Sequence, residues 1–424
     1  MKSFLHYLVI IILFTITNNS FSQNCGAPST GFIPINDLGS GTYNGWTGGI
    51  YPGGSNYIPP VHKSAGLQMA SQIQCLDANG NPDPINGKIV WLSIGMSNTT
   101  QETQQFIPIA NAFSGKNPKV TLVDGAVGAM PASYISTPSH ANYASYWSTV
   151  ATRLSNAGVT ANQVEVIWLK QTNGVGTIPV QEFYDSLVVQ YKRIMHEVKT
   201  RFPNVKICYF SSRISARYAN VTLNPEPHSY WTGWAIKKVI EDQINGDVAL
   251  QFSGTGTNSP WIAWGSYMWS DGSTPQTTNP NVFWNCSTDF TSDGTHPSTT
   301  GAIKVANLWL DFLSTDSTAT PWFMGTGCNL STGIVESNAS KTINAFPNPS
   351  TGDFTIQLPQ KYSGKFQIDI YNSLGQKIFN EMRAISTTQK NIQIHQPNLT
   401  EGAYFIQLTQ GNEHFSEKII ITNK

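Results

Sequence analysis

The chain has 424 residues, which is more than one typical domain and enough for two or three. Basic and acidic residues number 25 each, so the net charge is zero and the basic surface that nucleic-acid binding requires is missing. Charged residues make up only 12% of the chain, about half the usual share, whereas 40% is hydrophobic. This composition suits an exported protein better than a cytosolic enzyme.

The N-terminal segment has the pattern of a signal peptide. Lys2 precedes an apolar stretch over roughly residues 4–16, and Ser20 and Ser22 lie at the −3 and −1 positions of a cut before Gln23. The apolar stretch is too short to span a bilayer comfortably. We therefore expect residues 1–22 to be removed. No later stretch is long and apolar enough to span, so we expect no transmembrane segment.

The central part of the chain alternates apolar strands with amphipathic helices. Residues 23–86 are rich in Gly, Pro, Asn and Tyr and predict an irregular lead-in packed on the domain that follows, residues 87–325. Strands are expected at residues 88–95, 119–126, 163–171 and 205–212, and helices at residues 98–113, 143–158, 181–202, 229–244 and 300–314. Continuous apolar strands separated by helices predict an α/β fold, with a parallel sheet covered by helices on both faces.

The C-terminal part has a different sequence pattern. Residues 326–341 have the composition of a linker, and residues 342–424 contain short alternating strands separated by turns, which predicts a small all-β immunoglobulin-like sandwich. The motifs NAFPNPSTGDF (344–354), IYNSLGQKI (370–378) and LTEGAYFIQL (399–408) resemble the type IX secretion sorting domain of Bacteroidetes proteins. The resemblance implies that the type IX secretion machinery is a partner, and that the protein is secreted or attached to the cell surface. The alternative is an ordinary immunoglobulin-like or carbohydrate-binding sandwich.

Five cysteines allow at most two intramolecular disulfides, which an exported protein can keep. Cys208 lies in the apolar segment VKICYF and is the expected unpaired thiol. Cys25 and Cys328 bracket the central region and could tie its ends together, but the sequence leaves the pairing open among Cys25, Cys75, Cys208, Cys286 and Cys328. Cysteine and histidine residues lack zinc spacing. Residues 77–88 begin like a calcium loop, but Pro82 stands where the turn glycine belongs and Lys88 replaces the final glutamate. We expect no metal and no cofactor.

Two segments carry side chains suited to nucleophilic catalysis. Ser97 directly follows the first apolar strand and opens a helix, so its hydroxyl is expected at the carboxyl edge of the sheet, where such sheets bind ligands. Asp293 and His296 precede the last helix, where the carboxylate can fix the imidazole tautomer while the other ring nitrogen faces a serine. Each residue alone could be a helix or turn cap. Together they indicate a Ser-His-Asp triad.

G-x-S after the first strand and D-x-x-H-P before the last helix resemble the SGNH hydrolases, an esterase superfamily with a flavodoxin-like sheet. The resemblance spans roughly residues 88–325. It implies that the oxyanion hole is formed by the Ser97 N–H together with a glycine and an asparagine from the ends of the second and third strands. In this sequence those residues are Gly128, with Gly125 less favoured, and Asn173.

The sequence departs from the family pattern at two positions. Met96 replaces the usual Asp before the serine, and Gly174 rather than Asp follows Asn173. The run from Gly95 to Asn98 is closer to the GQSN form of carbohydrate acetylesterases. The resemblance therefore implies a secreted serine esterase that removes acyl groups, expected to be acetyl, from a carbohydrate. The alternatives are a lipid or aryl esterase of the same superfamily and a noncatalytic polysaccharide-binding protein.

Substrate contacts are predicted from position alone. Tryptophans gather in residues 231–234, 260–269 and 282–284, where indoles such as Trp264 could stack on sugar rings or else pack in the core. Arg213 and Arg217 follow the fourth strand and could bind an anionic group of the substrate or form ion pairs. We predict Arg213 and Trp264 as substrate-binding residues.

Overall fold

The computed structural model describes residues 22–174, 177–325, 327–328, 343–358, 362–372, 376–386, 391–410 and 413–422. The expected signal peptide lies outside these residues except for Ser22, and so does the expected linker except for residues 327–328. Within the described part of the chain, every helix is too short or too polar to cross a lipid bilayer.

The central domain contains a five-stranded parallel sheet with the order β4-β3-β5-β6-β7. Its strands are β3 (Ile89–Gly95), β4 (Val120–Asp124), β5 (Val164–Lys170), β6 (Ile207–Phe210) and β7 (Trp261–Trp264). Every residue of β3, β5, β6 and β7 is buried, as expected for a parallel sheet covered on both faces. The predicted α/β fold is confirmed, and β7 is an additional edge strand inside the tryptophan-rich segment.

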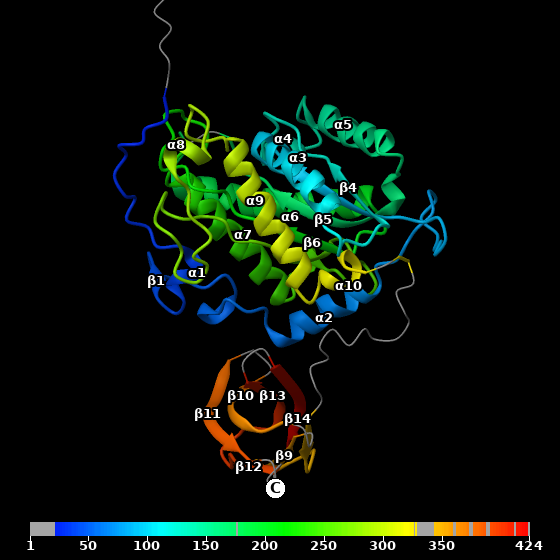
Figure 1. Ribbon diagram of the computed structural model, residues 1–424, viewed down its shortest axis with the longest axis vertical. Helices are drawn as coiled ribbons and strands as arrows, with labels where there is room; N and C mark the ends of the chain where they lie inside the picture. Colours follow the sequence, from blue (N-terminus) through cyan, green and yellow to red (C-terminus); the bar gives the residue numbers. More distant parts are fainter. Residues whose placement is uncertain are drawn as a thin grey trace, which may run out of the picture.

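Helices cover both faces of this sheet (Figure 1). One face packs against α3 (Ser97–Ala112), α9 (Thr299–Thr315), α2 (Pro60–Ser71) and the short α10 (Thr320–Phe323). The other face packs against α5 (Tyr143–Asn156), α6 (Val180–Arg201), α7 (His228–Ile244) and the short α4 (Ala132–Ile135). Alternate residues of β3 show how the pleat divides the core, since Trp91 joins the first face whereas Leu92 joins the second.

The lead-in is more regular than its composition predicts. It contains α1 (Ile35–Leu38), the hairpin strands β1 (Thr42–Tyr43) and β2 (Trp46–Thr47), a 3₁₀ turn at Pro52–Gly54, and α2. A Cβ on Gly66 would lie 2.4 Å from the Trp261 ring, so α2 can pack on β7 only through a glycine. That glycine interrupts the apolar periodicity by which a helix is recognised in a sequence. Further short elements are the 3₁₀ turns Ala161–Gln163 and Val248–Leu250 and the helix α8 (Cys286–Asp289).

Two disulfides and a polar network fasten the lead-in. Cys25 bonds Cys286 and Cys75 bonds Cys328, so the suggested Cys25–Cys328 link is wrong, whereas Cys208 is buried and unpaired as predicted. The pairing depends on loop paths, because each bond joins residues more than 250 positions apart.

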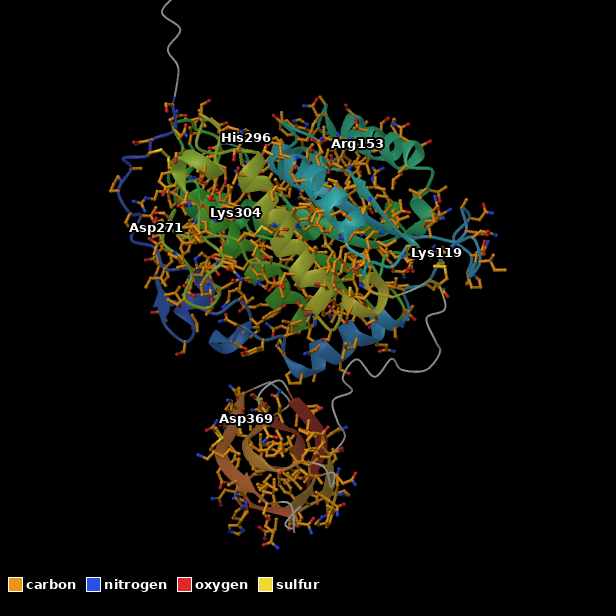
Figure 2. The ribbon with its side chains drawn as sticks, viewed as in Figure 1. Lys119, Arg153, Asp271, His296, Lys304 and Asp369 are labelled. Carbon is orange, nitrogen blue, oxygen red and sulfur yellow. A yellow bond between two sulfur atoms is a disulfide. The ribbon has the colours of Figure 1, made fainter. Side chains whose placement is uncertain are left out.

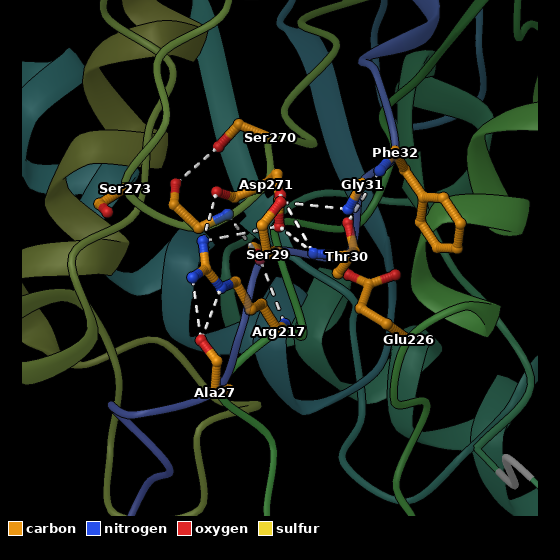
Figure 3. A network of polar contacts seen from close by, with 12 residues as sticks. Ala27, Ser29, Thr30, Gly31, Phe32, Arg217, Glu226, Ser270, Asp271 and Ser273 are labelled. Carbon is orange, nitrogen blue, oxygen red and sulfur yellow. Dashed lines mark hydrogen bonds and ion pairs between the residues drawn. The ribbon is translucent and has the colours of Figure 1, made fainter.

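The polar network centres on Asp271 (Figure 3). The Asp271 carboxylate accepts hydrogen bonds from the Ser29 hydroxyl and the Thr30 N–H. Arg217 donates to the Ala27 carbonyl oxygen at 2.9 and 3.1 Å. Arg217 therefore holds the lead-in and does not serve an anionic substrate group.

The C-terminal region consists of two antiparallel sheets with the orders β11-β10-β13-β14 and β12-β9-β8. Their strands are β8 (Asn344–Phe346), β9 (Asp353–Gln357), β10 (Gly364–Asn372), β11 (Lys377–Ile385), β12 (Asn391–His395), β13 (Gly402–Gln410) and β14 (Glu413–Ile421). Buried and exposed residues alternate along β9 and β12, and the buried ones join a separate apolar core. This arrangement confirms the predicted all-β sandwich.

Candidate active site

The nucleophile candidate lies where β3 turns into α3. Ser97 is the first residue of α3, and Gly95 is the last residue of β3. A Cβ on Gly95 would lie 2.3 Å from the Lys170 carbonyl oxygen and 2.2 Å from the Thr99 hydroxyl, so only glycine allows this turn. The turn places Ser97 at the carboxyl edge of the sheet, at the positive end of the helix dipole.

Ser97, His296 and Asp293 form a continuous chain of hydrogen bonds. The Ser97 Oγ lies 2.7 Å from His296 Nε2, and His296 Nδ1 lies 2.5 Å from Asp293 Oδ2. His296 is at the edge of the domain where α3 and α9 begin (Figure 2). With the ring proton on Nδ1 facing the carboxylate, Nε2 is free to accept the hydroxyl proton of the serine.

Further hydrogen bonds hold the Asp293 carboxylate in place. Its Oδ1 accepts from the backbone N–H groups of Thr295 and His296, both at 2.9 Å, and from the Thr291 hydroxyl at 2.8 Å. Burial would raise the pKa of Asp293, but the hydrogen bonds from the His296 ring, the two N–H groups and Thr291 outweigh it and lower the pKa to about 2. The aspartate is therefore ionised at neutral pH, as an imidazole orienter must be.

The structure distinguishes the two candidate oxyanion glycines. The Gly125 N–H donates to the Ser93 carbonyl oxygen at 3.1 Å, and it is therefore already used within the sheet. A Cβ on Gly128 would lie 3.6 Å from the Ser97 Cβ, so this backbone passes directly beside the nucleophile. The preceding Val127 N–H donates to the Gly95 carbonyl oxygen at 3.0 Å and holds the segment there. Gly128 is the better placed of the two.

Asn173 lies just beyond β5 with its amide orientation defined. Its Oδ1 accepts the Ser133 N–H at 3.1 Å, so its Nδ2 is directed away from that contact and remains available as a donor. Asn224 donates from its Nδ2 to the Asn173 carbonyl oxygen and to the Thr172 hydroxyl, both at 3.1 Å. Gln171, next to this segment, donates to the Met130 carbonyl oxygen at 2.9 Å.

Several residues that support the site were not singled out in the sequence analysis. Asn98 is buried and donates from its Nδ2 to the Thr295 carbonyl oxygen at 3.0 Å, which joins the start of α3 to the loop of His296. The motif G-x-S-N contains Asn98, so a signal for it exists. Ser133 and Asn224 carry no such signal, because Ser133 lies in the short helix α4 and Asn224 on the loop after β6, and only the path of the chain brings them to Asn173.

The two predicted substrate contacts differ in the structure. Trp264 is 3% exposed and donates from Nε1 to the Ile50 carbonyl oxygen at 2.7 Å. It packs in the core beneath the lead-in, so the prediction that it contacts substrate is wrong. Arg213 is also deeply buried but lies on the loop after β6, next to the end of β5 that leads to Asn173. Among the described residues, no group of three His, Cys, Asp or Glu side chains could hold a metal ion.

Comparison with known proteins identifies the C-terminal part. Residues 344–422 match the family model of the secretion system C-terminal sorting domain. This region is a type IX sorting domain, and it marks the protein for export to the outer-membrane surface or for secretion. No curated protein matches the chain.

Solved structures resemble the chain only weakly. Dimeric latent PorU from Porphyromonas gingivalis is 15% identical with a TM-score of 0.16, and the match covers 19% of this chain and 9% of that one. A carbohydrate acetylesterase from Xanthomonas citri is 10% identical with a TM-score of 0.29, covering 75% of this chain and 74% of that one. An extracellular lipase from Streptomyces rimosus is 10% identical with a TM-score of 0.25, covering 52% and 98%. The functional argument therefore depends on the site itself.

Proposed function

We propose that the protein is a secreted serine esterase of the SGNH type that removes acyl groups from a carbohydrate. The expected acyl group is acetyl. The observation that carries the proposal is the hydrogen-bonded chain from Ser97 through His296 to Asp293 at the carboxyl edge of a parallel sheet. A serine that opens a helix can serve as an N-cap, but an N-cap does not need an imidazole at 2.7 Å that is itself oriented by an ionised carboxylate.

In the proposed reaction, Ser97 Oγ attacks the ester carbonyl carbon while its proton passes to His296 Nε2. Asp293 stabilises the imidazolium that forms. The tetrahedral intermediate collapses when the alcohol leaves with the proton from His296, which leaves an acyl-enzyme on Ser97. Water then attacks the acyl carbon, His296 takes a proton from that water, and the carboxylic acid departs as the Ser97 hydroxyl is restored.

Three donors are available for the negative charge that develops on the carbonyl oxygen. They are the Ser97 N–H at the start of α3, the Gly128 N–H beside the nucleophile, and the Asn173 Nδ2. The Ser133 contact with Asn173 Oδ1 supports this assignment, because it prevents the amide from turning its oxygen toward the site. Preorganised donors of this kind each contribute roughly 3–4 kcal/mol to the transition state.

The carbohydrate substrate is inferred from the motif and the destination. The run from Gly95 to Asn98 resembles the GQSN form of carbohydrate acetylesterases, and the sorting domain delivers the protein to the cell exterior.

Hydrolysis of p-nitrophenyl acetate by the mature protein tests the proposal. We expect Ser97→Ala to reduce kcat by about 10⁵–10⁶-fold, because the nucleophile is lost. Ser155→Ala, on the exposed side of α5, is the matched control and should retain activity. Faster cleavage of p-nitrophenyl octanoate than of acetate would favour a lipid esterase. A wild-type protein that cleaves no ester would leave only the noncatalytic polysaccharide-binding alternative.

A further inference from the structure

Arg213 is a buried cation without a partner. The residue is only 4% exposed, and its Nε is enclosed by the protein with no hydrogen-bond acceptor. The structure gives its guanidinium no hydrogen bond and no ion pair with any described residue. A buried charge without an ion-pair partner is destabilising, so such a group calls for an explanation.

None of the neighbouring carboxylates forms an ion pair with Arg213. Three of them act electrostatically on Arg213, namely those of Glu102, Glu226 and Asp293. Glu102 pairs through Oε1 with Lys170 Nζ at 2.5 Å while its buried Oε2 has no hydrogen-bond partner, and Asp293 binds the His296 ring. Glu226 accepts from the N–H groups of Ala216 and Tyr230 and from the indole of Trp269. None of these carboxylates forms an ion pair with the guanidinium, which is left available for an anion from outside the chain.

The loop that carries Arg213 is bound to both parts of the candidate active site. It follows β6, which lies beside β5, and β5 leads to Asn173. Further along the same loop, the Asn220 N–H donates to the Asp293 carbonyl oxygen at 3.1 Å, and the Asn224 side chain donates to the Asn173 carbonyl oxygen. Arg213 therefore lies on a loop that contacts both the segment of the predicted oxyanion donor and the loop of the predicted base.

We propose that Arg213 binds a carboxylate of the substrate, so that the preferred ester is carried by an acidic sugar such as a uronic acid. This inference rests on the proposed esterase function and adds a substrate class to it. A guanidinium presents two parallel N–H groups that match the two oxygens of a carboxylate. One free guanidinium suits one planar monoanion, and a carboxylate that reaches it supplies the ion-pair partner that no described residue supplies.

A pair of substrates that differ only in charge tests the proposal. The pair consists of O-acetyl glucuronic acid and O-acetyl glucuronamide, and hydrolysis is followed as acetate release. For the wild type we expect kcat/KM to be about 10–100-fold higher for the acid, because a charge-assisted, bidentate contact is lost in the amide. Arg213→Met should reduce this ratio to near one. Arg213→Lys should leave an intermediate ratio, because it keeps the charge but lacks the two parallel N–H groups of a guanidinium.

Matched controls separate this role from a structural one. Arg193→Met removes the same charge from the exposed side of α6 and should keep the wild-type ratio. Arg213→Met should also raise the thermal midpoint, because it removes an unpaired buried charge. If Arg213 held the fold together through bridging water, the same change would lower the midpoint and reduce turnover of both substrates alike.

The proposal and the esterase function fail in different ways. Equal kcat/KM values for acid and amide in the wild type, with Ser97→Ala inactive, would overturn the carboxylate site and leave the esterase intact. If the wild type cleaves neither compound, calorimetry with glucuronic acid and glucuronamide still tests the anion site on the Ser97→Ala protein. Binding of the acid alone, lost in the Ser97→Ala/Arg213→Met double variant, would support the site. Equal binding of both compounds would refute it.

Discussion

The α/β region and the sorting domain each contain a histidine whose Nδ1 contacts an aspartate carboxylate. In the α/β region the pair is His296 and Asp293, three residues apart on one loop. In the sorting domain it is His395 and Asp353, which face each other across β12 and β9. The two pairs have the same chemical groups, so the difference between them lies in their surroundings.

Those surroundings differ in exposure and in partners. The side chains of His296 and Asp293 are 19% and 29% exposed, whereas those of His395 and Asp353 are 77% and 58% exposed. The Nε2 of His296 meets the Ser97 hydroxyl, and Asp293 accepts three hydrogen bonds besides that of the ring. The His395–Asp353 contact is an exposed cross-strand pair of small energetic value. A His–Asp contact therefore indicates catalysis only when a nucleophile and a supporting set of donors accompany it.

The largest expected effect contrasts the two histidines. His296→Ala should lower kcat for p-nitrophenyl acetate by about 10⁶-fold, because no other group can take the Ser97 proton. His395→Ala should leave kcat within about twofold of the wild type. The measurement is initial rates for purified variants whose circular dichroism matches that of the wild type. Comparable losses in the two variants would show that the surroundings do not distinguish the pairs.

A smaller effect contrasts the two aspartates. Asp293→Asn should lower kcat by about 10⁴-fold, because the amide no longer fixes the tautomer that leaves Nε2 unprotonated. The equivalent change Asp353→Asn should leave kcat unaltered. Initial rates across pH 6–9 provide the comparison. Asparagine caps a turn as well as aspartate does, so near-wild-type turnover of Asp293→Asn would reduce Asp293 to a turn cap.

The fold was predictable where the hydrophobic pattern was strong. The apolar runs at residues 88–95 and 163–171 predict buried parallel strands, and the strands found there, Ile89–Gly95 and Val164–Lys170, are fully buried. The strand β7 was not predicted, because four residues with two tryptophans fit a core strand and a sugar-binding loop equally well. The same ambiguity explains the error at Trp264. An indole has an apolar body and one polar N–H, and the sequence does not show whether its partner is a ligand or, as here, the Ile50 carbonyl oxygen.

The site was predictable where a reactive side chain lies at the end of a strand or the beginning of a helix. Ser97 follows a strand and opens a helix, and Asp293 and His296 precede a helix, so the topology of a parallel sheet was sufficient to place them on one edge. The Ser133 contact that orients Asn173 depends on where the chain places the short helix α4, which local residue preferences do not specify. The missing partner of Arg213 likewise becomes visible only when every nearby carboxylate has been assigned.

The smallest expected effect concerns stability and its pH dependence. The pKa of Asp293 is lowered from 3.8 to about 2, so the folded state favours the ionised carboxylate more than the unfolded state does. Its contribution to the free energy of unfolding is therefore complete above about pH 5 and is lost as the pH falls through the folded-state value. With allowance for partial exposure, we expect Asp293→Asn to lose about 1–2 kcal/mol at pH 7.

Urea unfolding followed by tryptophan fluorescence measures this loss in the right region, because all 12 tryptophans precede residue 323 and none lies in the sorting domain. The difference in the free energy of unfolding between wild type and Asp293→Asn should shrink as the pH falls below 4, where the Asp293 carboxylate is protonated first in the unfolded and then in the folded state. Asp353→Asn should not move the tryptophan transition at any pH. A difference that widened as the pH fell below 4 would contradict the lowered pKa of Asp293. It would mean that the hydrogen bonds around Asp293 do not stabilise its ionised form. The carboxylates of Asp293 and Asp353 would then differ only in where they lie in the molecule.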